Sequence, residues 1–208
     1  MSEYNKEQFA ALCMVQQHLA GLEVAPKEQL LKRLTGYLAY RKDVDNFLAE
    51  HFSAICTRTC YRDRLSACCS REGIISFFAD MVINALMSAT DEIEALKVVL
   101  QKPDRGFKCV YLGERGCMWR VKPIVCEMFL CDRARQTVFE QAPDLAAQWE
   151  AFIQAKKRYT WPDRPILFDD LEAVFLEAGL RSTLMYMHNS PGLLRVKRTA
   201  DGYLNRFP

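Results

Sequence analysis

The placement of cysteine is the feature that most limits how this chain can fold. Eight of its nine cysteines fall in little more than a third of the 208 residues. They form two sequence groups of four: Cys56, Cys60, Cys68 and Cys69, then Cys109, Cys117, Cys126 and Cys131. Four thiolates suit structural zinc and also iron–sulfur clusters. The pattern therefore predicts that all eight cysteines are metal ligands.

The sequence also indicates a reducing compartment. The first seven residues are polar and lack the apolar core of a secretory signal. No stretch approaches the ~20 apolar residues of a membrane span, and the longest apolar region, 74–87, is interrupted by Ser76, Asp80 and Asn84. We therefore expect a cytoplasmic protein with no membrane partner, whose thiols stay reduced. In that compartment a cysteine cluster indicates metal binding or catalysis before it indicates disulfides.

Charge gives no sign of a polyanionic partner. The formal net charge is +2 and the sequence pI is near 8.0. Nucleic-acid binding would need a concentrated basic face, whereas the short basic runs at 156–158 and 195–198 are typical of solvated surface. We therefore expect no nucleic-acid partner.

Apolar residues at helical spacing predict a mainly α fold. The predicted helices are one that ends near Gly21, one that begins at Pro26, one capped by Asp43 that runs into Cys56, one over 74–86, one over 91–100, and three more after Asp132, Pro143 and Asp169. Half of the residues are hydrophobic, so residues 1–208 can form a single domain without disulfides. A C-terminal hairpin is predicted near 190–202.

An irregular segment is expected between these helices. Glycine and proline recur from 102 to 131, and residues 109–112 are predicted to be a short extended piece. The predicted organisation is thus a helical N-terminal part (1–55), a loop-rich cysteine-cluster region (56–131) and a helical C-terminal part (132–208).

The cysteine spacings differ between the groups. Cys56 and Cys60 stand at i and i+4, which places both thiols on one face if the helix continues. Cys68 and Cys69 are adjacent, and adjacent side chains point apart. This pair indicates two metal centres, a multi-iron cluster, or one ligand beside a spectator. The second group lies in loops that can wrap a metal.

Nearby side chains suit a thiolate site. Cations lower thiol pKa values and stabilise the thiolate form. The basic residues among the cysteines are Arg58, Arg62, Arg64, Arg71, Arg115, Arg120 and Lys122, and the alternative is that they are solvated loop residues. His51 is either a further ligand or a core histidine. The alternative is that the eight cysteines are small buried hydrophobic residues, but their polar, turn-rich setting fits this poorly. Cys13 lies on an apolar helix face and does fit it.

Two motifs carry a resemblance to a known family. They are Gly-Cys-Met-Trp at 116–119 and Lys-Pro-Ile-Val-Cys-Glu-Met-Phe-Leu-Cys at 122–131. With the preceding Cys68-Cys69, they resemble the CxxCxxCC-type family of zinc- or iron-chelating domains (YkgJ-like). The family's usual form is Gly-Cys-x-aromatic, then Arg-Pro-x-x-Cys-x-x-Phe-x-Cys. Here Lys122 replaces the arginine, and the first group is stretched to Cys-x3-Cys-x7-Cys-Cys.

The resemblance implies zinc or iron and leaves the role open. Our first hypothesis is a metal-binding protein that serves electron transfer, sensing or structural support, with a protein redox partner or protein substrate. An iron–sulfur cluster is favoured over zinc because no Cys-x2-Cys occurs. Some relatives of the family resemble lysine N-methylases, so the alternative is a cluster-dependent methyltransferase.

The enzyme hypothesis yields no candidate catalytic residue. The radical motif Cys-x3-Cys-x2-Cys fails at Asp63, and Asp63, Glu72, Glu114 and Glu127 are interpreted as surface carboxylates. The third hypothesis is metal trafficking or redox sensing through an exchangeable thiol of the Cys68-Cys69 pair.

Overall fold

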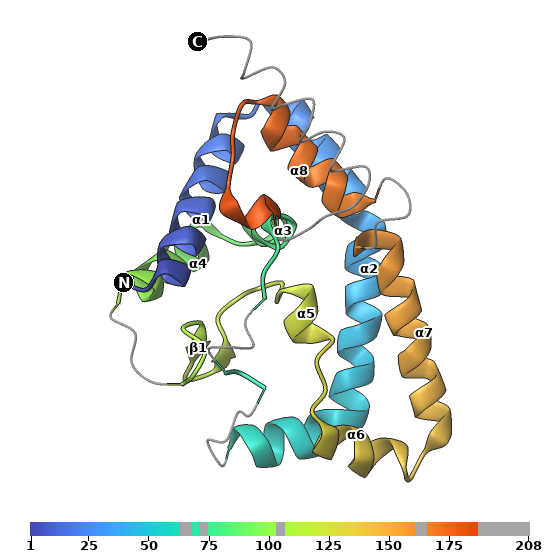
Figure 1. Cartoon of the computed structure of the whole chain (residues 1–208). Helices are drawn as coiled ribbons and strands as arrows, with labels where there is room; N and C mark the ends of the chain where they lie inside the picture. Colours follow the sequence, from blue (N-terminus) through green and yellow to red (C-terminus); the bar gives the residue numbers. More distant parts are fainter. Residues whose placement is uncertain (63–67, 71–74, 103–106, 161–165, 187–208) are drawn as a thin grey trace.

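The computed structural model describes residues 1–62, 68–70, 75–102, 107–160 and 166–186. The fold is mainly α, as predicted, with one small hairpin (Figure 1). Along the chain the elements are α1 (Glu3–Gly21), α2 (Val24–Ile55), the π-helical turn η1 (Cys56–Tyr61), α3 (Phe78–Met87), α4 (Thr90–Gln101), β1 (Leu112–Gly113), β2 (Gly116–Cys117), α5 (Ile124–Glu127), α6 (Asp132–Phe139), α7 (Pro143–Thr160), α8 (Leu167–Glu177) and the 3-10 turn η2 (Thr183–Tyr186).

The long helix α2 corrects one prediction. It runs without interruption through Asp43, where we had predicted that one helix ends and another begins. Asp43 is exposed and simply occupies the solvent side of the helix, while Leu34, Tyr37 and Val44 continue one buried stripe past it. A continuous apolar stripe favours a continuous helix over a cap. Pro26 is tolerated because it lies in the first turn.

The end of α2 leads directly into the first cysteines. Cys56 and Cys60 lie on η1, where the backbone has the wider π-helical winding in place of the predicted α-helical turn. Both thiols are free, and both residues are half-buried. Short π-helical segments occur often at functional sites.

The helices surround an aromatic core. α1 packs on α3 and α4, and α8 packs on α3 and α2. The Phe78 and Phe175 rings meet edge to face at 5.1 Å between centroids, joining α3 to α8. α7 lies along α2 (Figure 1), where Trp149 stacks on Phe47 at 5.7 Å. The helix predicted over 91–100 is confirmed as α4, which is separate from α3.

Between α4 and α6 the chain forms the expected irregular segment. β1 and β2 pair as an antiparallel hairpin with Leu112 opposite Cys117. Gly116 has φ +105°, a conformation that a side chain would strain, so glycine is needed at this turn. The predicted extended piece at 109–112 is instead mainly a turn, because the Leu112 amide donates to the Cys109 carbonyl at 3.1 Å. The predicted C-terminal hairpin lies outside the described residues.

Among the described residues, no helix is both long enough and apolar enough to cross a membrane.

Candidate metal centre

Cys69 is joined to the second sequence group by backbone contacts. The Cys109 amide donates to the Cys69 carbonyl at 3.0 Å, and Ser70 and Lys108 form an isolated antiparallel bridge beside it. The turn at Cys109 then leads into the hairpin that ends in Cys117. The strand-like contact therefore brings together Cys69 and Cys109, 40 positions apart by residue number.

The thiols of this neighbourhood influence one another. Burial, together with the Cys117 and Cys126 thiols, raises the pKa of Cys109 to about 12. Burial and the Cys117 thiol likewise raise the pKa of Cys126 to about 11. Cys109, Cys117 and Cys126 all act on the pKa of Cys69. We call these four residues the Cys69 set.

The other four cysteines form a second neighbourhood. Burial, followed by the nearby thiols of Cys68, Cys131 and Cys60, raises the pKa of Cys56 to about 11. Cys60 lies one turn along η1, and Cys131 is the residue that precedes α6, which packs against α2. We call Cys56, Cys60, Cys68 and Cys131 the Cys56 set.

The adjacent residues Cys68 and Cys69 are divided between the two sets, so each set combines cysteines from both sequence groups. The Cys68 thiol donates a hydrogen bond to Cys69, which raises the pKa of Cys68 and lowers the pKa of Cys69. Cys68 is exposed and contributes to the Cys56 set, whereas Cys69 contributes to the other. The Cys68 thiol also raises the pKa of Cys126, so the two sets lie next to each other.

The donor chemistry suits a soft metal, but ligation requires the thiols to move closer. All nine cysteines are free. In the described part of the chain, no three Cys, His, Asp or Glu side chains are already arranged to hold a metal ion. Because burial raises the pKa of Cys56, Cys109 and Cys126, these thiols are protonated at neutral pH. Metal binding would therefore release protons as it draws the thiols together.

His51 and Cys13 have other neighbours among the described residues. The His51 ring packs edge to face on Phe47 at 4.8 Å, and its Nε2 is 3.9 Å from Glu50. This packing favours the core-histidine interpretation. Cys13 is half-buried on α1, and burial raises its pKa.

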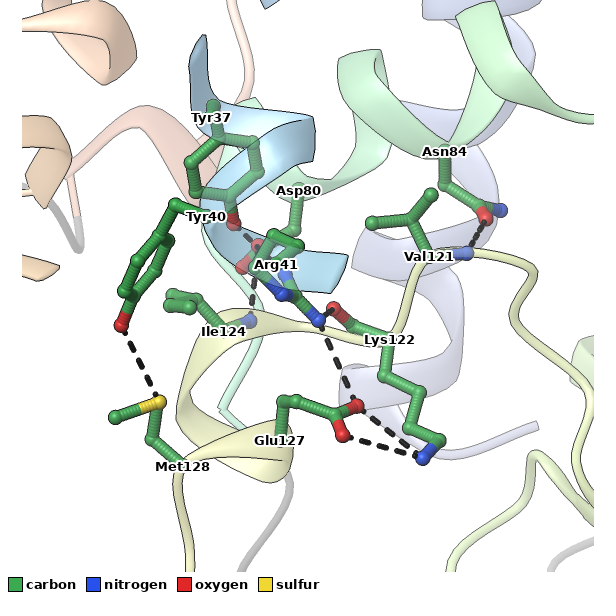
Figure 2. Close-up of polar contacts among 10 residues, drawn as sticks. All are labelled: Tyr37, Tyr40, Arg41, Asp80, Asn84, Val121, Lys122, Ile124, Glu127 and Met128. Atoms are coloured by element: carbon green, nitrogen blue, oxygen red, sulfur yellow. Dashed lines mark hydrogen bonds and ion pairs between the residues drawn. The ribbon is translucent and has the colours of Figure 1, made fainter. Parts of the chain in front are cut away.

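The segment that carries Cys126 is fixed by polar side chains of α3 (Figure 2). Asp80, only 2% exposed, accepts hydrogen bonds from the backbone amides of Phe77 at 3.0 Å and Ile124 at 3.1 Å. Asn84, one turn later, accepts from the Val121 amide at 3.1 Å. The buried loop amides thus donate to these side chains instead of to water.

Helix α2 holds the same segment from the other side (Figure 2). Arg41, 7% exposed, donates to the Tyr37 hydroxyl and to the Lys122 carbonyl, each at 2.8 Å. Its guanidinium also lies 3.6 Å from Glu127, whose carboxylate is 3.2 Å from the Lys122 amino group. The Tyr40 hydroxyl donates to the Met128 sulfur at 3.4 Å. Residues 121–128 are thus anchored to two helices.

Sequence reasoning missed this anchor. Glu127 was interpreted as a surface carboxylate, which is wrong: it is buried and ion-paired. Asp80 and Asn84 appeared only as interruptions of an apolar run, although polar residues at i and i+4 on such a helix signal buried partners. Arg41 lies among the apolar residues of α2 and could have been noticed for the same reason.

The predicted cationic residues play unequal parts. Burial raises the pKa of Cys117, and Lys122 opposes that effect. Arg120 pairs with Glu92 at 3.3 Å, and Arg58, Arg62 and Arg115 are exposed. Arg64 and Arg71 lie outside the described residues, as do two of the candidate carboxylates, Asp63 and Glu72; Glu114 is exposed.

Asp80 predicts a pH dependence of stability. Burial raises its pKa from 3.8 to about 6, although two backbone amides and Arg41 favour the charged form. The folded state therefore binds the proton more tightly, so this residue's contribution is fully present below pH 3.8 and is lost as the pH rises through 6. The free energy of unfolding of the wild type, minus that of Asp80→Asn, should fall by up to roughly 3 kcal/mol between about pH 3.5 and pH 7.

Urea unfolding of reduced, metal-free protein at both pH values measures this difference. Asp43→Asn, which removes an exposed carboxylate from α2, is the control. A difference that stays constant or grows with pH would contradict the assignment.

Comparison with known proteins identifies no relative. No family model, curated protein or solved structure matches this chain.

Proposed function

We propose that this chain is a metal-binding protein that holds an iron–sulfur cluster or zinc through its eight clustered cysteines. The observation that carries the proposal is that eight free thiols, distant in sequence, lie near enough for neighbouring thiols to shift one another's pKa values, in two adjoining sets. The ligands would be Cys56, Cys60, Cys68 and Cys131 in one set and Cys69, Cys109, Cys117 and Cys126 in the other. An iron–sulfur cluster is favoured over zinc because the chain has no Cys-x2-Cys.

The anchor described above supports this proposal. A metal site needs ligands whose backbone is held in place, and outer contacts that orient them. Asp80, Asn84 and Arg41 hold the backbone on either side of Cys126. Reduced thiols are required, which favours a cytoplasmic location. Structural support, electron transfer and sensing all use such a site.

A protein partner is the second part of the proposal. Phe107 is 88% exposed and Phe129 is 53% exposed, and each stands close in sequence to cysteines. Exposed aromatic side chains are typical of surfaces that bind other proteins. We propose that these residues meet a redox partner or a protein substrate. The methyltransferase alternative depends only on the family resemblance of residues 56–131.

The proposal is tested by anaerobic purification, followed at once by a visible absorption spectrum and analysis for iron, zinc and sulfide. A brown protein with matched iron and sulfide would support a cluster, and a colourless one with one or two zinc ions per chain would support zinc. The control is a variant with all eight cysteines changed to serine. Metal contents no higher than in this variant would contradict metal binding.

A further inference from the structure

A pocket of about 260 Å³ lies between α2 and the segment 120–127. Its charged lining residues are Arg41, Lys42, Arg120 and Lys122, together with Asp45 and Glu127. Four formal positive charges against two negative ones leave a net charge of +2 around this space. The volume lies just below the range of ordinary small-molecule sites, which limits an occupant to a small molecule.

Arg41 forms a fixed wall of this pocket. Its two terminal nitrogens donate to Tyr37 and Lys122, so its guanidinium is held in one place and keeps its positive charge beside the space. A guanidinium matches the oxygens of carboxylates and phosphates.

The other cations can reach an occupant. Lys42 is exposed and forms no ion pair within the described residues. Arg120 is half-exposed and shares its charge with Glu92 at 3.3 Å. Lys122 is shared with Glu127. The pocket thus combines a fixed, buried cation with more exposed ones.

We propose that this pocket binds a small dianionic oxyanion, a molecule with a phosphate group or two carboxylates. The charge of such a ligand complements the net charge of the lining. Charge-assisted hydrogen bonds from Lys42 and Arg120 would hold it against Arg41. Lys122 also acts on the Cys117 thiol, but anion binding at this pocket does not require the proposed metal.

Titration calorimetry of the full chain with inorganic phosphate and with succinate tests the proposal, at constant ionic strength set with sodium chloride. We expect saturable binding of at least one probe, and the stronger probe identifies the ligand class. Lys42→Gln and Arg120→Gln should each weaken binding about tenfold, as expected for loss of one charge-assisted bond. Both replaced side chains lie at the rim, and circular dichroism checks that the variants fold.

The matched control is Arg33→Gln, which removes an exposed cation of α2 that pairs with Asp170 at 3.9 Å. Its affinity should equal that of the wild type. The proposal is overturned if neither probe binds, or if the Lys42 and Arg120 variants bind as tightly as the control.

Discussion

Changing Cys69 to serine is expected to remove metal from a different centre than changing Cys68. Cys69 lies with Cys109, Cys117 and Cys126, whereas Cys68 lies with Cys56, Cys60 and Cys131. The loss of one thiolate in four should empty that centre, because a serine hydroxyl is a poor ligand for a soft metal. Each single variant should therefore lose about half of the bound metal, as measured by elemental analysis of anaerobically purified protein.

Double variants make this test decisive. Cys69→Ser combined with Cys117→Ser should lose no more metal than either change alone, because both affect one centre. Cys68→Ser combined with Cys117→Ser should lose nearly all of it. Cys13→Ser is the control, since Cys13 lies on α1 and belongs to neither set.

The possible failures are distinguishable. If the wild type holds no metal, metal binding itself is wrong. If the wild type holds metal but the Cys68 and Cys69 variants behave alike in every pairing, the division into these two sets is wrong and the sequence groups are the ligand sets.

Replacing Arg41 with methionine is expected to destabilise the fold by about 3–5 kcal/mol, the cost of leaving buried partners of a charge unpaired. The Tyr37 hydroxyl and the Lys122 carbonyl would each lose a donor, and Glu127 would keep only Lys122. Urea unfolding measures the change as a shift of the midpoint at constant slope. The protein should be reduced and metal-free, so that metal binding does not mask the loss.

Arg33→Met is the matched control for this prediction. It removes an arginine from the same helix, but its ion pair with Asp170 is half-exposed on both sides. Such surface pairs contribute at most about 1 kcal/mol. Equal losses in the two variants would show that the buried contacts of Arg41 do not stabilise the segment that carries Cys126.

The sequence correctly predicted a mainly α fold but misplaced a helix boundary. The apolar spacing correctly predicted α1, α4 and α7 because periodicity is a property of one segment and its own exposed and buried faces. It placed a helix end at Asp43 because a capping residue and an exposed helix residue look the same in sequence. Only the packing of Tyr37 and Val44 against other helices distinguishes them.

The sequence by itself determined three properties: a mainly α chain, an irregular segment where glycine and proline recur, and the confinement of eight thiols to residues 56–131. The tertiary structure decided which thiols are neighbours, since a backbone hydrogen bond joins Cys69 to Cys109, and the packing of α6 on α2 brings Cys131 near enough to Cys56 to raise its pKa. It also decided that Arg41, Asp80 and Glu127 are buried. A charged side chain can be buried only where another segment supplies its partner, and no local pattern records which segment that is.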